Sequence, residues 1–208
     1  MFDFTLEKIK IDLLLTFKAK DTKTILCTSS HVGEGTTTAA ICVARSLSCE
    51  TKSKILLVDS NFRSPCIHEI FNLPQSPGLA DLLEGREDTH SVIQESKDKL
   101  ISIMTSGSIP EKPLGLFRTN RFKDVLEELK NSFDYVVFDI APVLLFSDAS
   151  LVAGHFDGMV LVIECEKTRY EVVSTALEAL RKTDAIILGI ILNKRRYYIP
   201  EGIYKRLR

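Results

Sequence analysis

The sequence lacks paired cysteines and a strong net charge. Its five cysteines are odd in number and scattered, and no two have the Cys-x-x-Cys spacing of a zinc or redox site. A disulfide framework is therefore not indicated, and a reducing cytoplasm fits this cysteine usage best. The net charge of −1 provides no overall attraction to nucleic acid, so we expect no nucleic-acid partner.

The sequence also lacks a long apolar run and a targeting segment. No run approaches the roughly 20 apolar residues that cross a bilayer. The N-terminus has no basic region followed by an apolar one, so it is not a signal peptide. We expect a soluble chain of one domain, residues 1–208, because 45% hydrophobic and 26% charged residues are typical of a globular α/β protein.

A glycine loop follows the apolar run at residues 25–27. Gly33 and Gly35 are separated by one residue, and three threonines then open a helical pattern. Strand, glycine loop and helix start form the setting of a phosphate-binding P-loop, whose backbone N–H groups and helix dipole face one point. Thr37 stands where the motif's hydroxyl reaches Mg²⁺. The motif requires Gly-Lys-[Ser/Thr], yet position 36 is Thr36, so the lysine that neutralises the β- and γ-phosphates is absent.

Apolar runs alternate with amphipathic segments along the rest of the chain. The runs are apolar on both faces, as in buried parallel strands. The pattern therefore predicts a three-layer α/β P-loop NTPase fold, with a mainly parallel central sheet and helices on both faces. The expected strands are residues 24–29, 54–59, 100–104, 134–139, 158–164 and 185–193. The expected helices are residues 1–20, the segment from the P-loop to about 48, and residues 78–85, 90–96, 116–130 and 168–182, with residues 61–77 as loop.

Two aspartates end predicted buried strands, Asp59 and Asp139. The carboxyl ends of strands carry the active-site residues of open α/β sheets. In P-loop NTPases a strand-end carboxylate holds Mg²⁺, directly or through water. Asp139 is the Walker B candidate, and Asp59 could orient a nucleophile or bind the metal's water shell. Aspartates also cap turns, but a glycine loop ahead of both favours a nucleotide site.

Residues 28–35 read Thr-Ser-Ser-His-Val-Gly-Glu-Gly, and residues 56–65 read Leu-Leu-Val-Asp-Ser-Asn-Phe-Arg-Ser-Pro. These segments resemble the two signatures of the bacterial tyrosine kinases that accompany capsule and exopolysaccharide export, Thr-Ser-x-x-Pro-Gly-Glu-Gly and Asp-x-Asp-x-Arg. That family lies in the MinD/ParA-like branch of P-loop proteins. The resemblance extends over nearly the whole chain, through Phe133 to Pro142 and on to Asp148.

The resemblance implies a site for ATP or ADP with Mg²⁺. The implied nucleotide-binding residues are Gly33, Glu34, Gly35, Thr36, Thr37, Thr38 and Asn193. The implied metal-binding residues are Thr37, Asp59 and Asp139, and the implied catalytic residues are Asp59, Arg63 and Asp139. Residues 194–208 form a basic, tyrosine-rich tail, and the implied sites of autophosphorylation in trans are its Tyr197, Tyr198 and Tyr204. Tyr197 and Tyr198 could instead pack on the surface after the last strand.

The departures from the family pattern lie mainly at the residues implied in nucleotide binding and catalysis. Thr36 replaces the lysine, Asn61 replaces the second aspartate, and residues 139–142 read Asp-Ile-Ala-Pro instead of Asp-Thr-Pro-Pro. Loss of one positive contact of this kind typically lowers the rate about 10²- to 10³-fold. We therefore expect weakened nucleotide binding and an impaired or lost kinase activity, unless a basic side chain such as Arg63 substitutes. An active autokinase is the first alternative. A ParA/MinD-type ATPase switch is the second, although His31 occupies the position of its signature lysine.

The family also implies partners. A membrane-spanning polysaccharide co-polymerase is the expected activator, which would place the chain in the cytoplasm at the inner face of the cell membrane. The basic tail could also contact anionic lipid. Homo-oligomers are implied as well, although the family's N-terminal contact motif, Glu-x-x-Arg-x-x-Arg, reads Glu7-x-x-Lys10-x-x-Leu13 here.

Overall fold

The computed structural model describes residues 22–195 apart from Lys52 and Asp98. The predicted helix of residues 1–20 and the tail beyond Arg195, with its three tyrosines, lie outside the described residues. Within the described part, no helix is both long and apolar enough to span a bilayer.

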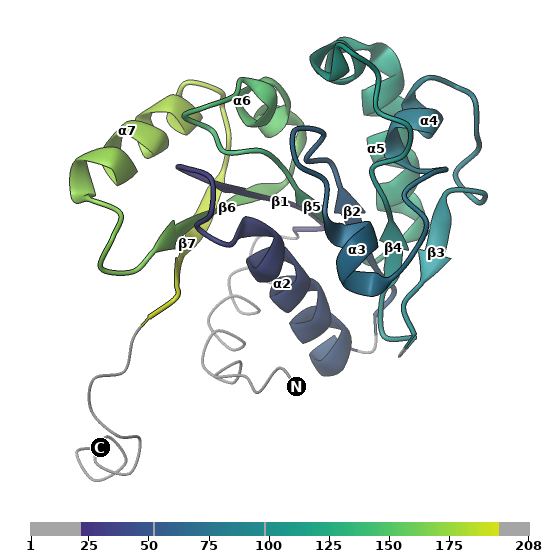
Figure 1. The fold of residues 1–208 in the computed structure, drawn as a ribbon, viewed down its shortest axis with the longest axis horizontal. Helices are drawn as coiled ribbons and strands as arrows, with labels where there is room; N and C mark the ends of the chain where they lie inside the picture. Colours follow the sequence, from purple (N-terminus) through teal and green to yellow (C-terminus); the bar gives the residue numbers. More distant parts are fainter. Residues whose placement is uncertain (1–21, 52, 98, 196–208) are drawn as a thin grey trace, which may run out of the picture.

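A seven-stranded sheet forms the centre of the molecule, with the order β3-β4-β2-β5-β1-β6-β7 (Figure 1). Only β3 is antiparallel to its neighbour, and the other pairs are parallel. The strands are β1 (Thr24–Ser29), β2 (Ile55–Asp59), β3 (Ile93–Glu95), β4 (Ser102–Met104), β5 (Tyr135–Asp139), β6 (Gly158–Glu164) and β7 (Ile187–Asn193).

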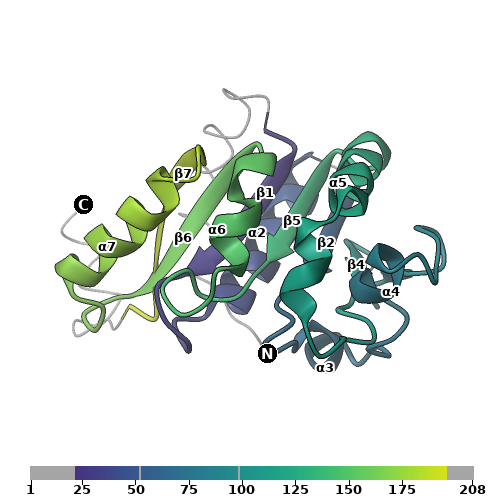
Figure 2. The same ribbon diagram turned by 90° about the horizontal axis from the view of Figure 1, so that it is seen from above.

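Helices cover both faces of this sheet (Figures 1 and 2). One face carries α2 (Thr36–Thr51) and α3 (Ile67–Phe71). The other carries α4 (Leu79–Leu83), α5 (Asn120–Ser132), α6 (Asp148–Val152) and α7 (Tyr170–Arg181), with 3₁₀ turns at Pro113–Arg118 and Ala153–His155. The predicted three-layer fold is therefore confirmed.

Alternating strand residues explain why the runs are apolar on both faces. In β1, Ile25 and Cys27 are buried under α2, whereas Leu26 is buried on the side of α5 and α6. In β5, Val137 packs on the first side and Phe138 on the second. Successive side chains of a strand point to opposite faces, so a strand covered on both sides must be apolar throughout.

Three sequence expectations were wrong. Residues 90–96 do not form a helix: they include β3, which pairs with β4 at the sheet edge. The predicted loop of residues 61–77 contains α3, whose five residues are too short to show helical periodicity. β7, predicted as buried, is the edge strand opposite β3 among the described residues, and Leu192 in it is 60% exposed.

Candidate functional site

The sheet order brings the three predicted motifs together. β5 lies between β1 and β2, so the P-loop after β1 and the aspartates that end β2 and β5 meet at one edge of the sheet. Asp59 and Asp139 are register partners on neighbouring strands. The carboxyl ends of the strands are where ligands of open α/β sheets bind.

Asp139 and Thr37 form the centre of this site. The Thr37 hydroxyl donates a hydrogen bond to Oδ2 of Asp139 at 2.5 Å. The other carboxylate oxygen of Asp139, Oδ1, is buried and has no hydrogen-bond partner among the described residues. A buried charged oxygen without a partner is expensive, so this atom indicates a missing cation or donor.

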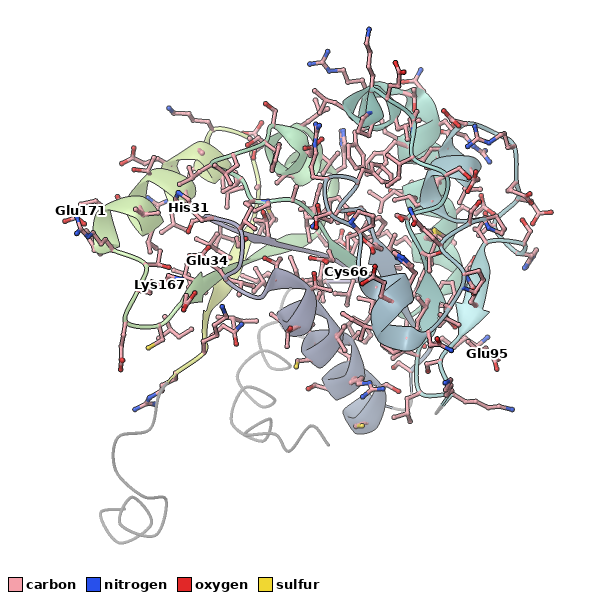
Figure 3. The ribbon with its side chains drawn as sticks, viewed as in Figure 1. His31, Glu34, Cys66, Glu95, Lys167 and Glu171 are labelled. Carbon is pink, nitrogen blue, oxygen red and sulfur yellow. The ribbon has the colours of Figure 1, made fainter. Side chains whose placement is uncertain are left out.

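Asp59 has a different environment, although it is equally buried. Its carboxylate accepts backbone N–H groups from Asn61 at 3.3 Å, Cys66 at 3.1 Å and Ile67 at 3.0 Å. Two of these donors open α3, so Asp59 fixes the start of that helix. The sulfur of Cys66 also lies 3.5 Å from Oγ1 of Thr37. Figure 3 labels Cys66 beside α3.

Burial raises the pKa of both carboxyl groups. The pKa of Asp59 rises from 3.8 to about 6, because desolvation outweighs its backbone hydrogen bonds. The pKa of Asp139 rises well above its usual value, first through burial and then through repulsion by Asp59. A divalent cation bound by these carboxylates would offset this repulsion.

The donor set fits Mg²⁺ delivered with phosphates. Mg²⁺ usually takes one or two carboxylates, keeps several waters and shares its remaining positions with substrate phosphates. Thr37, Asp59 and Asp139 provide that partial set. In the part of the chain that the structure describes, no group of three or more His, Cys, Asp or Glu side chains could hold a metal by itself.

The P-loop has the backbone of an anion-binding loop. Gly33 and Gly35 have φ values of 86° and 88°, which favour glycine. The first helical bond runs from the N–H of Ala39 to the carbonyl of Gly35 at 3.0 Å. The preceding N–H groups, at Thr36, Thr37 and Thr38, therefore lie at the helix N-terminus, where such groups and the helix dipole favour phosphate.

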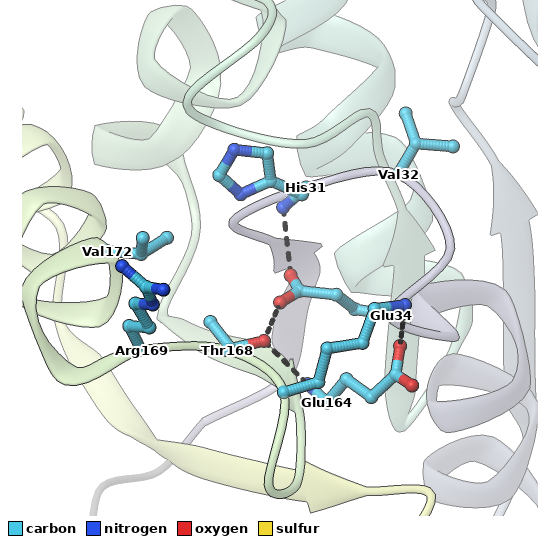
Figure 4. Close-up of a pocket in the computed structure, with 8 residues that line it drawn as sticks. His31, Val32, Glu34, Glu164, Thr168, Arg169 and Val172 are labelled. Carbon is cyan, nitrogen blue, oxygen red and sulfur yellow. Dashed lines mark hydrogen bonds and ion pairs between the residues drawn. The ribbon is translucent and has the colours of Figure 1, made fainter.

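The side chain of Glu34 fixes the conformation of the P-loop through hydrogen bonds within the protein. Its buried carboxylate accepts the N–H groups of Ser30 and His31, both at 2.8 Å, and a hydrogen bond from the Thr168 hydroxyl (Figure 4). Burial acts to raise the pKa of Glu34, but these hydrogen bonds outweigh it and lower the pKa. The carboxylate is therefore committed to the protein, and a nucleotide contact from Glu34 would use its backbone N–H.

A cavity of about 340 Å³ lies between the P-loop and the turn after β6. His31 and Val32 line it from the P-loop, and Thr168 and Arg169 line it from the turn (Figure 4), with Lys167 also among the lining residues. Thr168 joins the two sides through its bond to Glu34. Sequence reasoning missed Thr168, because nothing local marks a partner 134 residues away.

Asn193, predicted to contact the nucleotide, lies against the P-loop. Its side-chain amide donates to the carbonyl of Glu34 at 2.8 Å. A Cβ at position 35 would lie 2.2 Å from the amide nitrogen of Asn193. Gly35 therefore leaves room for the end of β7 as well as permitting its positive φ.

Arg63, predicted as catalytic, forms an ion pair with Asp148. Its guanidinium binds Asp148 in bidentate fashion, with Nε to Oδ2 at 3.0 Å and Nη2 to Oδ1 at 3.2 Å. The ring of Phe146 lies 5.0 Å from the guanidinium carbon. In this arrangement the guanidinium of Arg63 is paired with Asp148, and its predicted catalytic role stays a prediction.

We expect Arg63→Ala to destabilise the protein by about 1–3 kcal/mol, because Asp148 would keep a buried charge without its partner. Denaturant unfolding measures this loss. Arg118→Ala, at an exposed position, is the control and should stay within about 0.5 kcal/mol of the unmodified chain. A stability unchanged in Arg63→Ala would contradict the role assigned to the ion pair.

The parallel sheet, the glycine loop at a helix start and the strand-end aspartates define a P-loop protein of the nucleotide-binding type. Comparisons with known proteins identify the family within this class. A family model described as an AAA domain matches residues 22–188. Tyrosine-protein kinase YwqD of Bacillus subtilis is 34% identical over 174 residues, which cover 84% of this chain and 73% of that protein.

Two further comparisons agree. Tyrosine-protein kinase CpsD of Streptococcus agalactiae is 32% identical over 181 residues, covering 86% of this chain and 79% of that protein. The crystal structure of the VpsO kinase domain superposes with a TM-score of 0.80 at 28% identity, covering 93% of this chain and all of that one. The chain therefore belongs to the bacterial tyrosine-kinase family of P-loop proteins.

Proposed function

We propose that the chain is a nucleotide-binding member of this family with impaired or lost kinase activity and a regulatory or assembly role in polysaccharide export or biosynthesis. The observation that carries the proposal is Thr36, the first residue of α2, at the position of the P-loop lysine. Arg63 does not compensate for it, because Asp148 binds its guanidinium. Asn61 also lacks the second carboxylate of the family signature.

Retention of a nucleotide is supported by the rest of the site. Thr37, Asp59 and Asp139 lie together, and the unpartnered oxygen of Asp139 fits a cation. When bound, Mg²⁺ would offset phosphate charge. The chain's own groups would orient the ligand: the loop N–H groups face the phosphates, and Asn193 lies beside the loop.

The expected partner is a membrane polysaccharide co-polymerase. The proposal places the chain in the cytoplasm at the inner face of the cell membrane, held there through that partner or through the basic tail. Assembly of several copies is part of the same proposal. These points rest on the family resemblance, and co-purification with a membrane fraction tests them.

Two alternatives lead to different results. An active autokinase would phosphorylate Tyr197, Tyr198 and Tyr204 of a neighbouring copy. A ParA/MinD-type switch would hydrolyse ATP without labelling tyrosine. The similarity to two tyrosine kinases above 30% identity favours the kinase family over the switch.

The test combines binding with labelling. Calorimetric titration of the purified chain with Mg·ADP and Mg·ATP should show binding weaker than that of a lysine-containing P-loop. Incubation with Mg·ATP should leave little or no phosphotyrosine in the tail. Strong labelling that disappears in Asp59→Asn would establish the active autokinase instead, and no binding of either nucleotide would refute the nucleotide site.

A further inference from the structure

Two consecutive carbonyl groups of the P-loop are held by the end of β7. The side-chain amide of Asn193 donates to the carbonyl of Glu34 at 2.8 Å, and the ammonium group of Lys194 donates to the carbonyl of Gly33. Lys194 also lies 3.2 Å from Oε2 of Glu164. Its backbone has a φ of 56°, which turns the chain out of the strand at this position.

These contacts have a consequence for the anion-binding side of the loop. In a trans peptide unit the carbonyl and the following N–H point in opposite directions. Holding the carbonyls of Gly33 and Glu34 toward β7 therefore turns the N–H groups of Glu34 and Gly35 the other way. Those N–H groups are the donors that a P-loop offers to phosphate oxygens.

Lys194 also adds a positive charge to a loop that lacks one. Position 36 is threonine, so the loop has no lysine of its own. Glu164 holds the Lys194 ammonium beside the loop, which restricts the movement of a long side chain. Lys167 pairs with the same Glu164 oxygen at 3.1 Å, whereas Lys194 bonds both to that oxygen and to the P-loop carbonyl of Gly33.

We propose that Lys194 is a positioning residue of the phosphate-binding loop: with Asn193 it holds the carbonyls of Gly33 and Glu34, so that the loop N–H groups stay directed at a nucleoside diphosphate. This inference rests on the proposed nucleotide site and deepens it. It assigns a P-loop role to a residue outside the glycine motif, 161 residues along the chain from Gly33.

The test uses a matched pair of variants in the full chain. Lys194→Gln removes the charge and the strong donor beside Gly33, whereas Lys167→Gln removes an equal charge from the same Glu164. Calorimetry with Mg·ADP should show about three- to tenfold weaker binding in Lys194→Gln, as expected for loss of one charged hydrogen bond at a half-exposed site. Lys167→Gln should bind as the unmodified chain does, and Lys194→Arg should recover most of the affinity.

A second readout is independent of nucleotide. The NMR chemical shifts of the amides at Glu34 and Gly35 in the ligand-free protein should change in Lys194→Gln and stay unchanged in Lys167→Gln, with similar melting temperatures in both, because these amides share peptide units with the carbonyls of Gly33 and Glu34. Equal effects of the two variants, or an unchanged loop in Lys194→Gln, would overturn the assignment. If the unmodified chain fails to bind Mg·ADP, the proposed function fails, whereas the amide chemical shifts still decide whether Lys194 positions the loop.

Discussion

Replacing Thr36 by lysine is expected to strengthen Mg·ATP binding about 10- to 100-fold, the effect of a new charged hydrogen bond to the phosphates. Tyrosine labelling should increase about 10²- to 10³-fold, because charge stabilisation supplies most of the catalysis in phosphoryl transfer. Thr36 is half-buried at the first position of α2, beside the loop N–H groups. A lysine there starts at the same backbone position as in the complete motif.

Thr38→Lys is the matched control. It adds the same charge two residues further along α2, where the side chain is exposed. A general attraction of nucleotide to a more basic loop would strengthen binding in both variants. A gain confined to Thr36→Lys supports a specific contact. No gain in Thr36→Lys would show that the defect extends beyond position 36, with Asn61 as the next residue to restore to aspartate.

The parts of the site that could be predicted are those encoded locally. The glycine loop, the helix start and the strand-end aspartates Asp59 and Asp139 each follow from a short pattern. Parallel pairing then brings them to one edge of the sheet. For the same reason the buried strands β1, β2, β5 and β6 were predicted closely, because continuous apolar runs mark strands covered on both faces.

The parts that could not be predicted depend on contacts between distant segments. Nothing in the sequence near Arg63 indicates a partner for its guanidinium. In the fold that partner is Asp148, which lies 85 residues further along the chain. The sequence places Lys194 at the start of a basic tail, but in the fold its ammonium group bonds to a P-loop carbonyl. β3 and α3 were missed because each is shorter than the window in which a period can be recognised.

The carboxylate pair leads to a second large expectation, on stability. Asp139→Asn should raise the free energy of unfolding of the nucleotide-free protein by about 1–3 kcal/mol near pH 8, because it removes a buried charge with an unpartnered oxygen. For a chain of this size that corresponds to a melting temperature several degrees higher. The same variant should lose the stabilisation that Mg·ADP gives to the unmodified chain, since a ligand stabilises only the state that binds it.

The pH dependence follows from the direction of the pKa shifts. The carboxyl groups of Asp59 and Asp139 have pKa values raised in the folded state, that of Asp59 from 3.8 to about 6. Between these values the folded state binds more protons than the unfolded state, so the unfolding free energy should fall as the pH rises through about 6. Thermal melts from pH 4.5 to 8 should show this decline in the unmodified chain and a flatter profile in Asp139→Asn.

Asp157 is the control, because its pKa is shifted in the opposite direction from that of Asp139. Burial acts to raise its pKa, but hydrogen bonds from Lys130, at 2.6 Å, and from the backbone of Thr24 and Lys23 outweigh it and lower the pKa. This carboxylate therefore stabilises the fold at neutral pH, and Asp157→Asn should lower the melting temperature. Stabilisation by Asp139→Asn together with destabilisation by Asp157→Asn would support the interpretation of Asp139 as a ligand of a bound cation. A lower melting temperature in both variants would show that the Asp139 carboxylate stabilises the fold, as that of Asp157 does. The interpretation of Asp139 as a cation ligand would then be wrong.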